Sequence, residues 1–375
     1  MTERNQFALM LSGGGARAAY QVGVLKAVTN FLPRNQSIPF PIICGTSAGA
    51  INATTLACFA SCYHLGVRKL DWVWKNLTPS KIYESDFQAV FGHIIKNYFK
   101  GTDADNLPRA TSLLNNQPLR QLLRKTLDFD RLDNNIQRGV LKAICITASS
   151  YTSHDSISFF QSNEFAEGWE RSKRRGLPAQ LNVEHLMASA AIPLVFPSVK
   201  LGNDYFGDGS VHQLSPLSAP IHLGANRIFV IGVDQPEPNY MQSVNQQYPS
   251  ASNIAGHLLD TIFADTLNAD LERAYRINET LGLMTDKQRA QTHLRPIECL
   301  EINPSENFNE IAANYYHRLP GGIRTLLRMV GLKPDIESSL PSYLLFDSKF
   351  CEALIDVGYH DAMARQDEIR DFLML

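Results

Sequence analysis

A serine flanked by small residues stands between two apolar stretches of the chain. The sequence Gly45-Thr46-Ser47-Ala48-Gly49 has the GxSxG pattern, with an apolar run before it and an apolar segment of helical spacing after it. This context is typical of a sharp strand-to-helix turn that exposes a serine hydroxyl. The dipole of the following helix favours negative charge at that hydroxyl. We predict that Ser47 is a nucleophile supported by Gly45 and Gly49; the alternative is a turn whose serine only caps the helix.

A glycine-rich loop comes earlier in the chain. Gly13, Gly14 and Gly15 follow the short apolar run from Phe7 to Leu11. Without Cβ atoms, their N–H groups can turn inward and bind a phosphate or a transition-state oxyanion. No Gly-Lys-Ser/Thr follows, so a P-loop is excluded. The Rossmann pattern fits loosely, because no acidic residue lies about 20 residues further on. The serine turn that follows favours an oxyanion loop.

Arg17 stands two residues after these glycines. We expect it to anchor the loop or to meet an anionic group of the substrate. The alternative is a salt bridge on the protein surface, where most arginine side chains lie.

Asp208 lies between Gly207 and Gly209, a pattern that suits a tight turn. A serine hydrolase also needs a base, and a carboxylate shielded from water could take the serine proton directly. Its pKa would have to be raised from the ordinary value of about 3.9. We predict that Asp208 is this base, supported by Gly209, and the plain turn is the alternative.

A Ser–His–Asp triad is the competing arrangement. Its candidates are His212, His222 and His257, of which His212 follows Asp208 most closely. An α/β-hydrolase normally places its serine turn after several strands, whereas here only two apolar runs precede it. This order disfavours a histidine triad. The remaining histidines show no spacing typical of metal ligands.

The elements that hold these residues follow from the apolar pattern. We expect strands at 7–11, 40–44, 140–148, 156–160 and 227–233, a strand edge or turn at 205–211, and helices at 16–31, 50–63, 183–191 and 254–283. Alternating strands and helices at the start of the chain are typical of a parallel α/β fold. Residues 64–138 are predicted to be a helical insertion or cap, 239–252 a loop or linker, and the rest helical with proline breaks.

Together these motifs resemble the patatin-like phospholipase family. They stand here as GGGAR at 13–17, GTSAG at 45–49 and DGS at 208–210, with MASAAIPLVFP at 187–197 similar to the segment before the family's aspartate. Their combination in this order is more specific than any one of them. Two residues depart from the family pattern: Ala18 replaces a frequent glycine, and Ser210 replaces Gly or Ala. Both are small, so the pattern is kept.

The resemblance implies a three-layer α/β/α fold with a mainly parallel central sheet. Residues 7–238 would form the catalytic domain and residues 239–375 a mainly helical C-terminal extension. It also implies a Ser47–Asp208 dyad without a catalytic histidine, an oxyanion hole formed by the glycine loop, and an acyl-serine intermediate. No metal and no cofactor are implied.

The implied substrate is an acyl ester of a phospholipid or a lysophospholipid. Two alternatives stay open. An acyltransferase would use the same dyad with an acceptor alcohol in place of water. A regulatory or scaffold protein would keep a silent site.

Composition excludes several other classes. Hydrophobic residues make up 44% and charged residues 19% of the chain, which argues against a mainly disordered protein. The formal net charge of −2 gives no overall attraction to nucleic acid. Six cysteines without a CxxC pair indicate a reduced, cytoplasmic protein. The uncharged stretch 35–67 is interrupted by prolines and glycines, so we expect a strand, a turn and a buried helix there rather than a membrane span.

Peripheral membrane contact is expected because the implied substrate is a lipid. Residues 315–332 place Ile323, Leu326, Leu327 and Val330 on one helical face and two arginines on another. This pattern suits a helix on an anionic membrane or a lid, and equally a helix packed on the domain. The basic run 171–175 is either a solvated face or a contact for phosphate headgroups.

Overall fold

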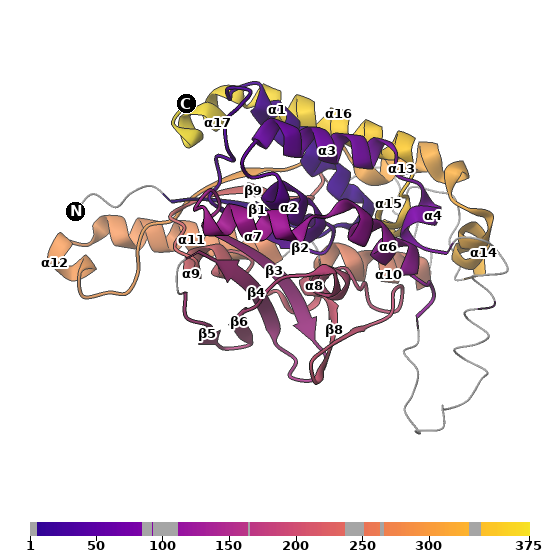
Figure 1. The fold of residues 1–375 in the computed structure, drawn as a ribbon, viewed down its shortest axis with the longest axis horizontal. Coiled ribbons are helices and arrows are strands. Elements are labelled where there is room, and N and C mark those ends of the chain that lie inside the picture. Colours follow the sequence, from indigo (N-terminus) through magenta and orange to yellow (C-terminus); the bar gives the residue numbers. More distant parts are fainter. Residues whose placement is uncertain are drawn as a thin grey trace, which may run out of the picture.

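A sheet of mainly parallel strands lies at the centre of the computed structural model, with helices on both of its faces (Figure 1). The structure describes residues 6–84, 92, 112–163, 166–236, 251–262, 266–329 and 339–375. The expected strand and helix alternation at the start of the chain is present, and the predicted α/β fold is confirmed.

The described strands form one sheet. Their order is β10 (Glu298–Ile302), β9 (Arg227–Ile231), β1 (Phe7–Leu11), β2 (Ile42–Thr46), β3 (Ala143–Ser150), β4 (Ser156–Ser162), β6 (Arg174–Pro178) and β5 (Trp169–Arg171), while β8 (Asp204–Asp208) pairs with β3 and with β7 (Val199–Leu201). Strands β10 to β3 are parallel, so their carboxyl ends meet at one edge. Strand β8 runs antiparallel to β3 and pairs Asp208 with Ala148. This pairing brings Asp208 to the edge where β1 and β2 end.

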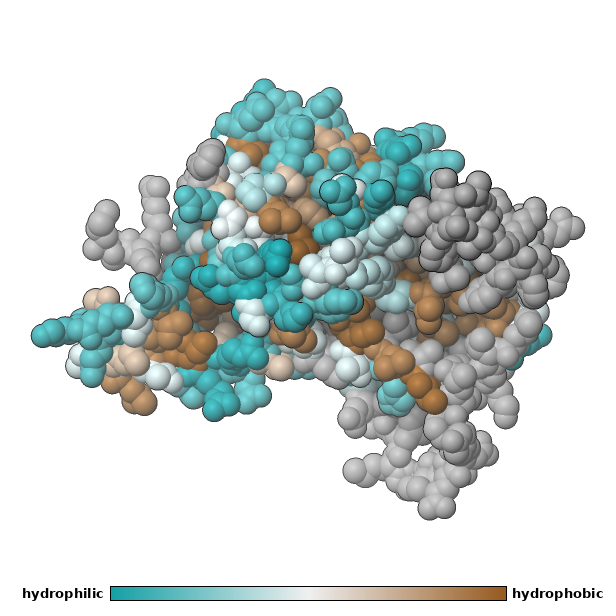
Figure 2. Space-filling model, turned by 90° about the horizontal axis from the view of Figure 1, so that it is seen from below, coloured by the Kyte–Doolittle hydropathy of each residue, from teal (hydrophilic) through white to brown (hydrophobic). Residues whose placement is uncertain are grey.

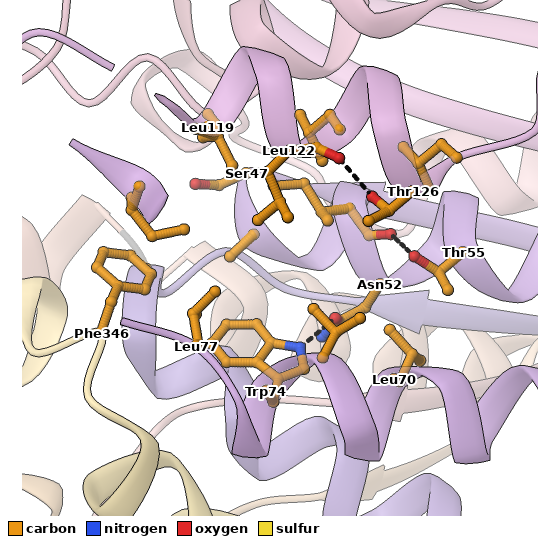
Figure 3. A pocket seen from close by; sticks show the side chains of 18 of the residues that line it. Ser47, Asn52, Thr55, Leu70, Trp74, Leu77, Leu119, Leu122, Thr126 and Phe346 are labelled. Carbon is orange, nitrogen blue, oxygen red and sulfur yellow. Dashed lines mark hydrogen bonds between the residues drawn. The ribbon is translucent and has the colours of Figure 1, made fainter. Parts of the chain in front are cut away.

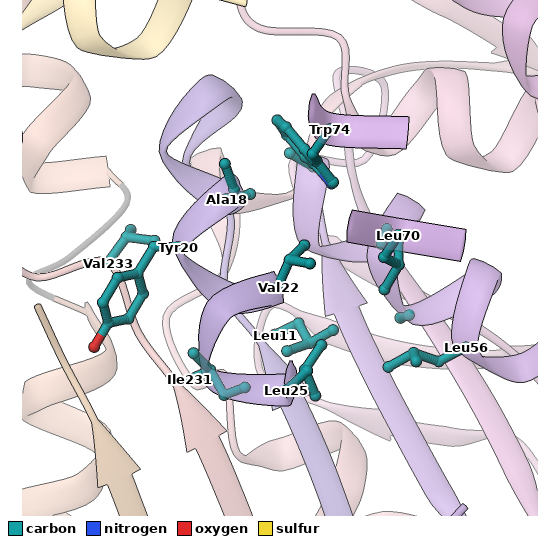
Figure 4. Close-up of a cluster of buried hydrophobic side chains, with 14 of the residues drawn as sticks. Leu11, Ala18, Tyr20, Val22, Leu25, Leu56, Leu70, Trp74, Ile231 and Val233 are labelled. Atoms are coloured by element: carbon teal, nitrogen blue, oxygen red, sulfur yellow. The ribbon is translucent and has the colours of Figure 1, made fainter. Parts of the chain in front are cut away.

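The two faces of the sheet belong to two cores, because successive residues of a strand point to opposite sides. Leu9 and Leu11 pack into the larger core with α1 (Ala19–Thr29), α2 (Ala48–Cys58), α3 (Tyr63–Lys75) and α16 (Ser348–Ala364). Figure 4 shows Val22 and Leu25 of α1 near Leu11 in this core. Met10 and Ile42 pack on the other face with α9 (Ser218–His222) and α11 (Thr266–Leu283). The sheet is therefore the middle of three layers.

The other described helices surround this centre. They are α4 (Pro79–Ile82), α6 (Gln117–Thr126), α7 (Phe129–Gln137), α8 (Val183–Ser189), α10 (Ala251–Asp260), α12 (Asp286–Arg289), α13 (Phe308–Tyr315), α14 (Gly321–Met329), α15 (Leu340–Leu344) and α17 (Gln366–Leu373). Short 3-10 turns, η1 (Gly15–Ala18) and η2 (Gly209–His212), follow the glycine loop and Asp208. Helices of the C-terminal part are thus present as expected.

Helices α1 and α16 cross so closely that their backbones touch. A Cβ atom added at Gly23 would lie 2.0 Å from the carbonyl oxygen of Ile355, and one added at Gly358 would lie 2.2 Å from that of Tyr20. Only glycine fits at both positions. The C-terminal helix α16 is thereby held directly against the helix that follows the glycine loop.

One expectation for the C-terminal part is wrong. The region after residue 283 was expected to be helical, yet β10 forms a parallel strand beside β9. Residues from both sides of position 238 therefore share one sheet, while the division into two domains there stays a prediction. The expected helix at 254–283 is two helices, α10 and α11. Residues 85–91 and 93–111 of the predicted insertion, and 239–250 of the predicted loop, lie outside the described residues.

The amphipathic helix expected near residue 323 is α14, and its apolar face is turned inward. Ile323 and Leu327 are buried in the larger core, and Leu326 packs against it; Val330 lies outside the described residues. This supports the packed helix rather than the membrane-surface helix. Among the described residues, no helix combines the length and the apolar character that crossing a bilayer requires.

Candidate active site

The turn between β2 and α2 holds Ser47 in a strained backbone conformation. Its φ of 55° and ψ of −128° are rare for a residue with a side chain. A Cβ atom at Gly45 would lie 2.5 Å from the carbonyl oxygen of Gly49, and one at Gly49 would lie 2.4 Å from that of Leu11. The two glycines of GxSxG therefore let the turn close and let α2 approach the end of β1.

Two side chains, those of Asp208 and Ser189, hold Ser47 by hydrogen bonds. Its hydroxyl donates a hydrogen bond to Oδ2 of Asp208 at 2.5 Å, and its backbone N–H donates to the hydroxyl of Ser189 at 2.9 Å. Ser189 in turn donates to the carbonyl oxygen of Thr147 at 2.6 Å. The contact of Ser189 with Ser47 is not visible in the sequence, because a serine in an alanine-rich helix gives no sign of its hydrogen-bond partner.

Asp208 is fully buried where β8 ends. Its second oxygen, Oδ1, accepts a hydrogen bond from the backbone N–H of Ser210 at 3.0 Å. Burial raises the pKa of Asp208 to about 6, and the hydrogen bonds from Ser47 and Ser210 oppose this rise. A Cβ atom at Gly209 would lie 2.1 Å from the carbonyl oxygen of Thr147, so the turn after Asp208 packs tightly on β3. A serine at position 210 suits this turn.

The candidate histidines make other contacts. The backbone N–H of His212 donates to Ser149, while His222 bonds with the carbonyl oxygen of Ser218 and stacks on Trp169. His257 is an exposed residue of α10. Ser47 reaches Asp208 directly, so the geometry supports a dyad rather than a triad. Within the described ranges, no group of three His, Cys, Asp or Glu side chains forms a metal site.

The glycine loop is fixed at the end of β1, beside the serine turn. The hydroxyl of Ser12 donates to the carbonyl oxygen of Ile231, and the carbonyl of Ser12 accepts from Gln21. Gly15 has a φ of +55°, and a Cβ atom there would lie 2.5 Å from the carbonyl oxygen of Tyr343. Among the described residues, no acceptor receives a hydrogen bond from the amides of residues 13–15. These amides are thus available to a ligand.

Arg17 is an internal anchor. Its side chain is 2% exposed, which does not fit a surface salt bridge. The guanidinium group donates to residues of α10, α13 and α15 instead: Asp260, Asn309, Ser342 and Tyr343. It is therefore held inside the protein by the C-terminal part, so of the two expected roles the structure supports the anchor.

An apolar cavity opens beside Ser47 (Figure 3). Its walls come from α2, α3 and α6 and from Phe346, and they include Ile51, Leu70, Val73, Trp74, Leu77, Leu119, Leu122, Leu123 and Leu127. Ser47 lines this cavity although only 1% of it is exposed to solvent.

Three polar side chains of the cavity wall, those of Asn52, Thr55 and Thr126, make hydrogen bonds within the protein. Oδ1 of Asn52 accepts from the indole N–H of Trp74 at 2.9 Å. The hydroxyls of Thr55 and Thr126 donate to the carbonyl oxygens of Ile51 and Leu122, one turn back in their own helices. Figure 3 shows these three hydrogen bonds along the wall. Apart from Ser47 and Lys69, a ligand in the cavity therefore meets mainly apolar groups, which suit an alkyl chain.

The sequence of this chain matches the model of the Patatin-like phospholipase family over residues 9–221. The chain belongs to the patatin-like phospholipase family. Among solved structures, the crystal structure of VipD from Legionella pneumophila matches with 12% identity and a TM-score of 0.34, covering 97% of this chain and 67% of that chain. No curated protein sequence matches.

The range matched by the patatin-like phospholipase family contains the glycine loop, Ser47 and Asp208. The residues that hold Arg17, such as Asp260 and Tyr343, lie outside it. Family membership supports lipid acyl hydrolase activity in general, and it says nothing of these C-terminal contacts.

Proposed function

We propose that this chain is a serine-dependent lipid acyl hydrolase that cleaves the carboxylic ester of a phospholipid or a lysophospholipid. The observation that carries the proposal is the hydrogen bond to a buried Asp208 from Ser47, which lines an apolar cavity. A nucleophile with an adjacent base is the signature of covalent catalysis. The cavity beside it suits the acyl chain.

In the first half of the reaction, Oγ of Ser47 attacks the ester carbonyl carbon while Oδ2 of Asp208 takes the hydroxyl proton. The carbonyl oxygen becomes an oxyanion, which the free amides of the glycine loop stabilise. The amide of Ala48, directly after the nucleophile, is a further donor of the kind that serine hydrolases use. Collapse breaks the ester bond, and the leaving alcohol takes the proton from Asp208.

In the second half, the acyl group is bound to Ser47 and Asp208 is again a carboxylate. It accepts a proton from a water molecule that attacks the acyl carbon. The same amides hold the second oxyanion. When this intermediate collapses, the proton returns to Ser47 and the fatty acid leaves.

Contact with a lipid surface is part of the proposal. Leu194 is 73% exposed and lies two residues after Ile192, which lines the cavity, while Leu214 is 60% exposed and lies two residues after the end of η2. The face seen in Figure 2 carries brown hydrophobic groups between hydrophilic ones. Replacing Leu194 and Leu214 with glutamate is expected to lower hydrolysis of vesicle lipid severalfold and to leave hydrolysis of a soluble ester unchanged. Equal losses on both substrates would contradict a surface role.

The activity is tested by incubating the purified chain with phosphatidylcholine and lysophosphatidylcholine in mixed micelles and measuring free fatty acid by mass spectrometry. We expect Ser47→Ala and Asp208→Asn to lower release by about a thousandfold or more. Ser61→Ala, at an exposed serine, is the matched control and should keep full activity. Equal release by the wild type and Ser47→Ala would overturn the proposal. Predominant acyl transfer to added glycerol would replace hydrolysis with the acyltransferase alternative.

A further inference from the structure

A short segment of the C-terminal part touches the proposed catalytic machinery on two sides. The residues from Ser339 to Asp347, here called the 339–347 segment, include α15 and are all buried. They lie outside the range that the family shares, residues 9–221. They are buried beside the glycine loop, and the Ser47–Asp208 dyad by itself gives them no role.

The first contact is between backbones. The carbonyl group of Tyr343 packs so closely on Gly15 that a Cβ atom there would lie 2.5 Å from its oxygen. Gly15 is the last residue of the glycine loop and also lines the cavity beside Ser47. The loop is thus confined between the serine turn on one side and Tyr343 on the other.

The second contact is through Arg17. Its Nε donates to the hydroxyl of Ser342, and one terminal nitrogen donates to Asp260 and to the hydroxyl of Tyr343, each at 2.9 Å. The other terminal nitrogen donates to Asn309 at 2.9 Å. The guanidinium carbon also lies 3.9 Å from the centroid of the Tyr343 ring.

The acceptors around Arg17 are themselves linked. The hydroxyl of Tyr343 donates to Oδ1 of Asp260, and that of Ser339 donates to Oδ2 of the same carboxylate. Ser342 donates to Asn309. A planar guanidinium in a linked set of acceptors has one orientation, so the backbone of Arg17 is fixed as well. Its N–H donates to the carbonyl oxygen of Gly14 at 3.0 Å, which passes this constraint to the loop.

The 339–347 segment also contributes one side chain, that of Phe346, to the wall of the cavity. Phe346 stacks with Trp74 at 6.5 Å between ring centroids, and Figure 3 shows it beside Leu77. The hydroxyl of Tyr83 donates to the carbonyl oxygen of Leu344 and so connects the segment to the end of α4. The 339–347 segment therefore contacts both the glycine loop and the apolar cavity.

We infer that the 339–347 segment is a positioning element of the active site, in which Tyr343, acting through Arg17 and Gly15, holds the oxyanion loop in register with Ser47. The inference rests on the proposed function. An oxyanion donor acts in the transition state, and a displacement of about 1 Å costs up to about a hundredfold in rate. Loss of positioning therefore lowers kcat and leaves KM unchanged. Phe346 acts on acyl binding instead, so its loss raises KM for long-chain esters.

The test compares Tyr343→Phe with Tyr359→Phe. Tyr343→Phe keeps the ring over Arg17 but removes the hydroxyl, whereas the hydroxyl of Tyr359 in α16 accepts a hydrogen bond only from Asn30 in the described structure. On a soluble short-chain ester, Tyr343→Phe is expected to lower kcat about tenfold at unchanged KM, and Tyr359→Phe to match the wild type. Asn309→Ala, which removes the acceptor for the other terminal nitrogen of Arg17, is the second variant and is expected to lower kcat in the same way.

Amide hydrogen exchange of the peptide covering residues 12–18 gives a readout independent of activity. Exchange is expected to be faster in Tyr343→Phe and Asn309→Ala than in Tyr359→Phe. Wild-type kcat and wild-type exchange in both variants would overturn the inference and leave the proposed function standing. A wild type that hydrolyses no ester, with faster exchange in the variants, would overturn the proposed function and leave the positioning contact intact.

Discussion

At the scale of single residues, two effects act in opposite directions on Asp208. Burial disfavours its charged form, while the hydrogen bonds from Ser47 and from the amide of Ser210 favour that form. Burial wins, and the pKa rises to about 6. This value lies close to neutral pH, where a general base is most effective.

The pH dependence of activity follows from this pKa. Asp208 must be ionised to take the serine proton, and its ionised fraction grows as pH rises through about 6. We expect kcat/KM for a soluble ester to rise about tenfold per pH unit below this midpoint and to level off above it. His212→Gln is the control and should keep the midpoint. A profile that His212→Gln shifts or abolishes would indicate a histidine base instead.

The same pKa makes a prediction for stability. The pKa of Asp208 rises on folding from 3.8 to about 6, so between these values the folded state binds more protons than the unfolded state. Stability contributed by this group is therefore lost as pH rises through this window, by up to about 3 kcal/mol at neutral pH. Asp208→Asn should be more stable than the wild type near neutral pH, and the difference should shrink toward pH 4. Urea unfolding at both ends of the window measures it; a variant less stable at both would contradict it.

The sharp turns at Ser47 and Asp208 were predictable from sequence because their motifs are local. Each residue lies beside small residues that such a turn requires, and the catalytic roles of both belong to the proposed function. The partners of Arg17 were not predictable in this way. Asp260 is 243 positions from Arg17 and Tyr343 is 326 positions from it, and only the tertiary fold brings them together.

At the scale of elements, the cavity is a product of helix packing. Helix α2 begins directly after Ser47, and both Ser47 and Thr55, eight residues further along, line the cavity. The helix rise between them is about 12 Å. Helices α3 and α6 supply the facing walls.

A larger side chain in this space should shorten the acyl chain that binds. Val73 of α3 lines the cavity and Arg68 of the same helix is exposed. We expect Val73→Trp to lower kcat/KM for long-chain esters about tenfold or more relative to short ones, because each methylene excluded from the cavity loses about 0.8 kcal/mol of burial. Hydrolysis rates over a series of 4-nitrophenyl esters measure this ratio. Arg68→Trp should not alter it, and an unchanged ratio in Val73→Trp would show that the acyl chain lies elsewhere.

Strands β1 and β2 were predictable because their short runs contain no charged residue and end in a loop or turn of small residues. Strand β10 was missed for the opposite reason. Glu298 and Glu301 interrupt its apolar residues. Pro296 and Pro304 lie on either side of it, and two prolines at this spacing indicate breaks between helices. Leu300 and Ile302, two positions apart, are buried in the core, and this short alternation of apolar and polar residues is the sequence signal for a strand.

At the scale of the whole molecule, the part beyond the family match completes the fold. Strands β9 and β10 extend the central sheet, and α16 packs along α1. The C-terminal part also supplies Phe346 to the cavity and Tyr343 to the glycine loop. We therefore expect the described elements on the two sides of residue 238 to unfold together.

A substitution where α1 and α16 cross tests whether the C-terminal part contributes to the stability of the whole fold. A methyl group at Gly358 would meet the backbone of Tyr20, so we expect Gly358→Ala to lower the free energy of unfolding by about 2 kcal/mol or more. Gly282→Ala is the matched control, because nothing lies within 4 Å of its Cβ position in α11. It should be neutral or stabilising by up to about 1 kcal/mol. Calorimetry of both variants measures the effect, and equal melting temperatures would argue against the close crossing.

The central claim is that Ser47 is a nucleophile activated by Asp208. The most direct test is reaction of the purified chain with a fluorophosphonate probe, followed by peptide mapping by mass spectrometry. The account predicts that the phosphonyl group is found on the peptide that contains Ser47, and that Ser47→Ala and Asp208→Asn are not labelled. Labelling of another residue, or undiminished labelling of Asp208→Asn, would contradict it.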